Sequence, residues 1–119
     1  MSIYQAELMD HFKNPRNRGE LANADIVTEE LNPSCGDSVQ LFILLDANKI
    51  KQINFLGKGC VISQAAASML TGKLLGMDLE EAKKLDSKFM VNLIGIELGP
   101  NRLQCALLPL VALQKGLSG

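Results

Sequence analysis

The spacing of apolar residues predicts a helix followed by strands in the first half of the chain. Over residues 3–13 the apolar positions recur every three to four residues, as on one stripe of a helix: Tyr4, Leu8, Met9 and Phe12. Pro15 cannot continue a helix and disfavours helical backbone just before it. The pattern therefore predicts a helix over 3–13 and then a loop, whose two arginines we expect to be solvated.

Three later runs, at residues 26–31, 39–45 and 50–56, are rich in β-branched and other apolar side chains and predict three strands. The second run alternates apolar with mixed positions, which is typical of a half-buried strand. The connection at residues 46–49 has hairpin length and carries Asp46 and Asn48, both turn residues. The second and third strands should therefore pair antiparallel.

Helical signals follow from Cys60 onward. Good helix formers and small residues at 65–70 predict a close-packed helix that ends at the glycines at 72 and 76. Asp78 and Glu81 have the spacing of a capping box, which predicts a short helix through Lys84. Asp86 is expected to cap another helix that closes at Gly95.

A last helix is indicated by apolar residues at helical spacing near the end of the chain: Leu107, Leu110, Val111 and Leu117. Pro109 is compatible with a helix only in its first turn, because proline lacks the N–H that later turns require. This rule predicts that the helix starts near Cys105.

Strands first and helices afterwards indicate an α+β fold, with a small three-stranded antiparallel sheet and helices packed on one face. The chain has 119 residues, of which 47% are hydrophobic and 21% charged, and it carries no repeat, linker or low-complexity tract. We therefore expect one domain over residues 1–119. A domain of this size can bury enough surface to fold without a metal.

Composition also excludes several classes of partner. No segment approaches the roughly 20 apolar residues that a membrane helix needs, and the chain does not open with a charged stretch and a long apolar run. We expect a cytoplasmic protein with no membrane partner. The net charge of −1, with one Tyr and no Trp, is also unlike that of a nucleic-acid-binding protein.

The three cysteines, Cys35, Cys60 and Cys105, lie within or directly after short runs of turn residues. A single cysteine usually packs as a small buried hydrophobe, but such runs are typical of exposed positions. An odd number of cysteines would leave one over in a disulfide framework, and so low a cysteine content is typical of a reducing compartment. The pattern indicates metal binding or thiol chemistry.

Cys60 and Cys105 fall at predicted helix starts, where unpaired N–H groups stabilise a thiolate. Three thiolates need a fourth ligand to complete a tetrahedral zinc or iron site, and Asp37 is the nearest candidate. An isolated aspartate here would instead bond a nearby backbone N–H in a turn. Gly36 allows tight curvature, so the side chains at 35 and 37 can point to the same side.

Other candidate chemistry is weaker. His11, the single histidine, is expected to face solvent and is left out of the site, and beyond it no base is evident for a Cys-His nucleophile. The Gly57-Lys58-Gly59 run lacks the Walker spacing of a phosphate-binding loop. We expect its glycines to let the chain turn closely around a metal, with Lys58 solvated or facing sulfur.

Four motifs in chain order carry a family resemblance. They are Ile3-Tyr4 with the run Met9 to Asn17, the run Leu31 to Asp37, the turn Gly57 to Cys60 with its helix from Ser63 to Thr71, and Arg102-x-x-Cys105. In this order they resemble the iron–sulfur cluster assembly scaffolds, the family of IscU, SufU and the amino-terminal domain of NifU. The resemblance spans nearly the whole chain.

In such proteins a cysteine desulfurase passes persulfide sulfur to the scaffold, iron joins it, and a labile [2Fe-2S] cluster is built and handed to acceptor proteins. The resemblance implies that Cys35, Cys60 and Cys105 are ligands and sulfur acceptors. It makes Asp37 the carboxylate that keeps the cluster exchangeable. A harder oxygen ligand in place of a fourth thiolate should loosen the hold on the cluster. Zinc is a further cofactor expected in the isolated protein.

The chain differs from the IscU and SufU members of the family in three places. IscU members typically have histidine before the third cysteine, where this chain has Gln104. They also carry a Leu-Pro-Pro-Val-Lys segment for a dedicated chaperone, replaced here by residues 98–102, so the resemblance does not imply a chaperone partner. SufU proteins share Arg-x-x-Cys and lack the histidine, but carry an insertion between the second and third cysteines that this chain lacks.

Two alternatives to a non-enzymatic scaffold stay open. One is a zinc-dependent sulfurtransferase, as SufU proteins are often described, in which the metal releases one cysteine to accept persulfide from the desulfurase. The other is a structural zinc module that only mediates contacts. Both use the same four residues, so ligand identity does not separate them, although a structural site would leave nothing to exchange.

Overall fold

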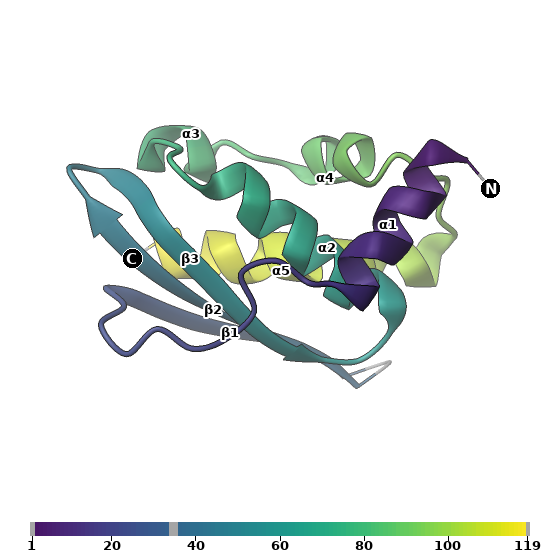
Figure 1. Cartoon of the computed structure of the whole chain (residues 1–119), viewed down its shortest axis with the longest axis horizontal. Coiled ribbons are helices and arrows are strands. Elements are labelled where there is room, and N and C mark those ends of the chain that lie inside the picture. Colours follow the sequence, from purple (N-terminus) through teal and green to yellow (C-terminus); the bar gives the residue numbers. More distant parts are fainter. Residues whose placement is uncertain (1, 34–35, 119) are drawn as a thin grey trace.

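A three-stranded antiparallel sheet carries the helices on one face (Figure 1). The computed structural model describes residues 2–33 and 36–118. The strands are β1 (Ile26–Asn32), β2 (Asp37–Asp46) and β3 (Lys49–Lys58), in the order β1-β2-β3. All three predicted strands and the antiparallel hairpin are confirmed. Ala47 and Asn48 connect β2 to β3 with φ of 51° and 66°, as a tight hairpin of this hand requires.

Five helices occur in the described part of the chain, and none of them is long and apolar enough to cross a lipid bilayer. They are α1 (Ile3–Lys13), α2 (Val61–Leu74), α3 (Leu79–Lys83), α4 (Ser87–Ile94) and α5 (Pro100–Leu117). Helix α2 is central and contacts the sheet, α1, α4 and α5. Its run of small residues at 65–67 is fully buried, so other elements can approach the helix closely.

The predicted stripe of α1 is buried only in part. Leu8 is in the core and Met9 is half-buried, whereas Tyr4 and Phe12 are exposed. Tyr4 instead lies against Gly95, where a Cβ atom would come within 2.3 Å of the ring. The helix period was therefore correct, but α1 lies at the edge of the domain and only one turn of its stripe reaches the core.

The prediction for the start of α5 is wrong. The helix begins at Pro100, its first residue, where the fixed φ and missing N–H of proline are compatible with a helix. Pro109 lies inside the helix and cannot donate to the carbonyl of Cys105, four residues earlier. Leu110, Ala112 and Leu113 beyond it are buried in the core. Packing of this face outweighs the local cost of the proline.

The helix ends follow the predictions less closely than the helices themselves. Asp86 caps α4 by accepting from the N–H of Phe89 at 3.0 Å, and Gly95 closes that helix with φ 75°, as predicted. Asp78 precedes α3 but its side chain makes no capping bond, so the capping box is wrong. Its carboxylate lies 3.9 Å from Lys49 instead. Helix α2 runs past Gly72 and ends at Leu74.

A polar seam on α2, which we define as Gln64, Ser68 and Thr71, binds the loop after α1. Arg18 donates to the side-chain oxygen of Gln64 at 3.3 Å, and the backbone N–H of Arg16 donates to Ser68 Oγ at 2.8 Å. Asn17 Nδ2 donates to Thr71 Oγ1 at 3.3 Å. The seam residues are buried and lie about one helical turn apart, so the loop lies along α2.

His11 belongs to the same region and is not solvent-facing, which corrects the sequence-based expectation. Its Nδ1 lies 2.7 Å from Ser68 Oγ, and the ring is half-buried. Burial lowers the pKa of His11 below its ordinary value, and the nearby positive charge of Arg16 lowers it further. The histidine therefore has a structural position between α1 and α2. The guanidinium of Arg16 pairs with Asp10, so this arginine is not simply solvated either.

Candidate metal and cluster site

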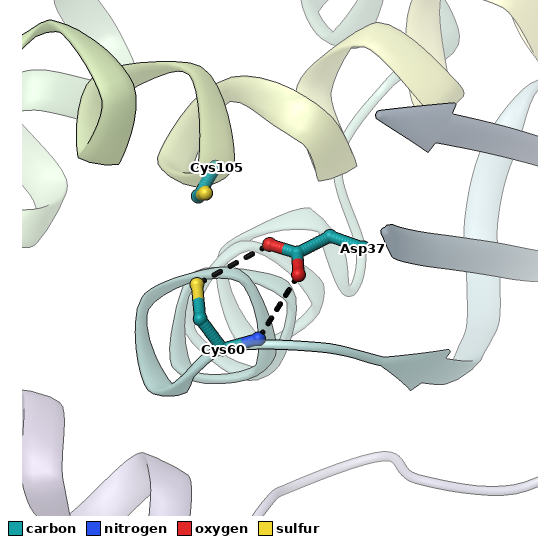
Figure 2. A group of neighbouring side chains, drawn as sticks. All are labelled: Asp37, Cys60 and Cys105. Carbon is teal, nitrogen blue, oxygen red and sulfur yellow. Dashed lines mark hydrogen bonds between the residues drawn. The ribbon is translucent and has the colours of Figure 1, made fainter. Parts of the chain in front are cut away.

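Three of the four predicted site residues come together at one end of the sheet. The side chains of Asp37, Cys60 and Cys105 point toward one another (Figure 2), and their ligand atoms all lie within 4.8 Å of one another. They come from three separate elements: the first residue of β2, the residue before α2, and the interior of α5. Cys35 lies outside the residues that the structure describes.

The register of the sheet explains why Asp37 and Cys60 meet. Lys58, the last residue of β3, pairs with Ser38 of β2. The chain that leaves β3 is therefore next to the beginning of β2, and Cys60 follows two residues later. A prediction of strands alone cannot place these two residues together, because the contact depends on the pairing register.

Asp37 is buried, with 2% of its surface exposed, and its carboxylate binds Cys60 twice. One oxygen accepts the backbone N–H of Cys60 at 3.1 Å and the other accepts the thiol proton at 3.2 Å. The backbone N–H of Cys60 is 23 residues away in the sequence, so the aspartate connects two elements. The alternative interpretation of Asp37 as a local turn residue is not tested by this bond.

Cys60 is the N-cap of α2, as the sequence predicted. Its sulfur lies 3.5 Å from the backbone N–H of Ser63, which donates to it. Helix N-terminal N–H groups stabilise a thiolate over a thiol, and this cysteine is partly exposed. Cys60 is therefore accessible, and its sulfur lies between a helix N-terminal N–H and the Asp37 carboxylate.

Cys105 has a different environment. It is 6% exposed and lies in the second turn of α5, not at a helix start. The stabilisation by helix N-terminal N–H groups that we expected for Cys105 does not apply, because the effect falls off within the first turn. The two described thiols are thus unequal, with Cys60 accessible and Cys105 set into the core.

Gly59 is necessary for this geometry. Its φ of +131° is one that L side chains rarely adopt, and a Cβ atom there would lie 2.1 Å from Asp37 Oδ1. At Gly57 a Cβ atom would lie 2.8 Å from the carbonyl oxygen of Ser38. These glycines permit a close approach of the chain, and the group that Gly59 admits is the Asp37 carboxylate. Whether the turn closes around a metal stays a prediction. Lys58 between them is exposed.

The donor set suits a thiophilic metal that also tolerates oxygen. In a tetrahedral zinc site, Zn–S bonds of about 2.3 Å and Zn–O bonds of about 2.0–2.2 Å separate the ligand atoms by about 3.6–3.8 Å. The ligand atoms of the three residues lie within 4.8 Å, so modest side-chain movements would suffice. A metal would displace the proton that Cys60 shares with Asp37, because only the thiolate is a ligand.

A cavity of about 720 Å³ lies beside the two thiols and receives residues from α1, α2 and α5. Leu8, Ile62 and Ile96 form part of an apolar wall, and Gln104 and Arg102 contribute polar groups next to Cys60 and Cys105. Sequence reasoning missed the cavity because its wall is assembled from distant segments. The signals in the sequence were the two cysteines, Arg102 of the Arg-x-x-Cys motif and Gln104, but nothing in the sequence indicated the wall that they share.

Comparison with known proteins identifies the class. The chain matches the NifU-like N terminal domain over residues 3–119, and it belongs to this family. Among its relatives is the "Zinc-dependent sulfurtransferase SufU" of Bacillus subtilis, 38% identical over 98% of this chain and 90% of that protein. Another is the "Iron-sulfur cluster assembly scaffold protein IscU 1" of Archaeoglobus fulgidus, 34% identical over 97% of this chain and 74% of that protein.

A solved structure agrees with the family assignment. The protein from Fervidobacterium islandicum described as a SUF-system iron–sulfur cluster assembly scaffold superposes with a TM-score of 0.80. It is 31% identical, and the match covers 98% of this chain and 96% of that one. The alignment to the Bacillus relative spans 134 positions, more than the 119 residues of this chain, so that relative has residues that this chain lacks.

Proposed function

We propose that this chain is a scaffold for iron–sulfur cluster assembly. It accepts sulfur from a cysteine desulfurase, builds a labile [2Fe-2S] cluster on Cys35, Asp37, Cys60 and Cys105, and transfers the cluster to acceptor proteins. The grouping of Asp37, Cys60 and Cys105 beside an open cavity carries the proposal. One core connects the sheet to all five helices, which supports a single scaffold domain over residues 1–119.

The different environments of Cys60 and Cys105 suit two steps of such a scaffold, the acceptance of sulfur and the holding of the cluster. Cys60 is accessible to an incoming persulfide, and as a thiolate it would be the attacking sulfur. Cys105 is buried, so water has less access to whatever it holds. The cavity beside both thiols gives a sulfur donor a path to them.

Asp37 would make the hold on the cluster reversible. A carboxylate is a harder ligand than a thiolate and matches iron in a sulfide cluster less well, so the mixed set should release its cargo more readily than four thiolates. Asp37 also has an alternative partner in the metal-free protein, because it accepts the Cys60 thiol proton. Release of the cargo can therefore be followed by a return to this hydrogen-bonded pair.

A site built from thiolates requires a reducing compartment, which supports the proposal that the protein acts in the cytoplasm. The desulfurase and the acceptor proteins are proposed partners. The three cysteines and Asp37 are enough to complete a four-coordinate site, so no further protein ligand is needed.

The second candidate is a zinc-dependent sulfurtransferase. The name of the Bacillus subtilis relative favours it. Gln104, at the position before Cys105, also agrees with it, because SufU proteins lack the histidine that IscU members have there. In this function zinc would hold the cysteines as thiolates. Cys60 or another cysteine would then accept sulfur, and no cluster would be built. The same residues would serve both functions.

Anaerobic reconstitution separates the two candidates. The purified chain is incubated with a cysteine desulfurase, cysteine and ferrous iron, followed by absorption spectroscopy and by zinc, iron and sulfide analysis. A visible iron–sulfur spectrum with stoichiometric iron and sulfide supports the scaffold. Persulfide formation with zinc fully retained supports the sulfurtransferase. No sulfur uptake at all would contradict both.

A further inference from the structure

Arg102 differs from the two other arginines of the chain. Arg16 forms an ion pair with Asp10, and Arg18 donates to Gln64 and lies over the ring of Phe55, 5.9 Å from its centroid. Both hold the loop after α1 in place. Among the residues that the structure describes, the side chain of Arg102 makes neither a hydrogen bond nor an ion pair, and it is exposed. No structural role in the fold accounts for it.

Arg102 lies beside the two thiols in the structure. It lies three residues before Cys105 on α5, and side chains three apart share one helix face. It lines the cavity together with Cys60 and Cys105. Within the described residues, no other charged side chain lines this cavity, whose remaining surface is apolar or neutral polar. Its lining therefore combines apolar and neutral polar side chains with two thiols and a single cation.

Sulfur transfer brings two anions together, so a cation beside the thiols could stabilise the reacting groups. A cysteine thiolate attacks the terminal sulfur of a donor persulfide, R–S–S⁻. The S–S bond of the donor breaks, a new S–S bond forms on the acceptor, and the donor leaves as the thiolate R–S⁻. Two negative charges must approach each other and remain until the donor departs, and an apolar cavity with few compensating groups opposes this.

We propose that Arg102 is the anion-binding residue of this cavity and holds the persulfide of the sulfur donor against the scaffold thiols. A guanidinium has several N–H donors and no acceptor, is always charged and is weakly hydrated, which suits it to a soft anion in a partly apolar space. The substrate class is the persulfide anion itself, on a protein or on a small thiol. This inference rests on the proposed function and adds a residue to it.

Two donors distinguish this role from simple docking of a partner protein. Glutathione persulfide is a small donor with no protein surface, whereas a persulfide-loaded cysteine desulfurase must dock. A cation that acts on the persulfide affects transfer from both donors. A cation that only contacts the surface of the desulfurase affects transfer from the protein donor alone.

The experiment measures single-turnover sulfur transfer to the chain, by mass spectrometry of the persulfidated protein, for wild type, Arg102→Gln, Arg102→Lys and Lys58→Gln. Lys58 is a matched control because it is an exposed cation two residues from Cys60 that does not line the cavity. Circular dichroism, thermal unfolding and zinc content verify that the variants are otherwise equal. An exposed side chain without a described partner can be replaced without loss of fold.

Arg102→Gln should lower the rate constant at least about tenfold with both donors, and Arg102→Lys should recover part of the loss because it restores the charge without the planar fork. Lys58→Gln should stay within about twofold of wild type. The rate with wild type should fall as salt is added, and this dependence should weaken in Arg102→Gln. Equal rates for Arg102→Gln and Lys58→Gln with glutathione persulfide would overturn the proposal.

A loss confined to the desulfurase would also overturn it and would make Arg102 a docking residue. A wild-type chain that accepts no sulfur from either donor would contradict the proposed function, and the role of Arg102 with it. An active wild type with an unaffected Arg102→Gln would contradict only the role of Arg102. The two failures are therefore distinct.

Discussion

The carboxylate of Asp37 binds Cys60 through both the backbone N–H and the thiol, at 3.1 and 3.2 Å (Figure 2). This pair joins the start of β2 to the start of α2. Asp37 is buried, so both the aspartate and the cysteine are held in position by the fold alone. Two residues of the proposed metal or cluster site are therefore positioned before a metal binds, and Cys105 lies close to this pair.

The first prediction concerns the turn that admits the Asp37 carboxylate. Gly59→Ala places a Cβ atom where Oδ1 of Asp37 now lies, so the carboxylate must move and zinc affinity should fall about tenfold or more. Gly76→Ala is the matched control, because its φ of +81° is also unfavourable for alanine but nothing lies within 4 Å of the new atom.

Gly76→Ala should lose about 1–2 kcal/mol of stability from backbone strain, and Gly59→Ala should lose more, because the clash with Asp37 adds to the strain at its φ of +131°. Only Gly59→Ala should also lose zinc affinity, measured by competition with a chelator. Equal zinc affinities for the two variants would show that the close approach of Asp37 to Gly59 has no bearing on the site.

The second prediction assigns the fourth ligand. Asp37→Ala removes the carboxylate and should lower zinc affinity by at least about 100-fold and change cluster lability strongly. Gln104→Ala should stay within about threefold of wild type, because a neutral amide binds zinc or iron weakly. Gln104→His in the Asp37→Ala protein should restore part of the affinity, since Gln104 precedes Cys105 and lines the same cavity. A large loss in Gln104→Ala with none in Asp37→Ala would reverse the assignment.

The third prediction concerns the pH dependence of stability. The folded pKa of His11 lies below its ordinary value of 6.5, mainly through burial and then through Arg16, with smaller opposing effects of Glu7 and Asp10. Between the folded and unfolded pKa values the unfolded chain binds more protons, so stability rises with pH in this window. Acidification from pH 7 through 6.5 should therefore lower the free energy of unfolding, and the loss should be complete below the folded pKa.

Urea unfolding of wild type and His11→Gln from pH 7.5 to 5 tests this prediction. The difference between the two proteins should change with pH below about 6.5 and be constant above about 7.5. Ser68→Ala should in addition lose about 1–3 kcal/mol at neutral pH, because the buried hydroxyl of Ser68 binds both the backbone N–H of Arg16 and Nδ1 of His11. Ser87→Ala, at an exposed position in α4, is the control. A wild-type profile parallel to that of His11→Gln would contradict the assigned environment of His11.

Local patterns predicted the elements well because they depend on neighbours in sequence. The alternation at 39–45 and the capping signals at Asp86 and Gly95 specified β2 and α4 within a few residues. The start of α5 was missed because the rule for Pro109 is also local, whereas burial of Leu110 and Leu113 is not. Tertiary packing thus decided where local rules conflicted.

Some features of the site could be predicted from the sequence and others could not. Turn residues around Cys60 indicated an N-cap that the structure has, and the family resemblance supplied the set of four ligands. Asp37 and Cys60 are separated by 23 positions in the sequence, and His11 and Ser68 by 57 positions. Such contacts depend on strand register and helix packing, which a single sequence does not reveal.

X-ray absorption spectroscopy at the zinc edge of the purified, zinc-loaded chain tests the central claim most directly. We expect one zinc per chain with about three sulfur ligands near 2.3 Å and one oxygen at about 2.0–2.2 Å. Cys60→Ser should reduce the sulfur shell by one, and Asp37→Ala should remove the protein oxygen. A shell of nitrogen and oxygen alone, or a sulfur shell unchanged in Cys60→Ser, would contradict the site formed by Asp37, Cys60 and Cys105.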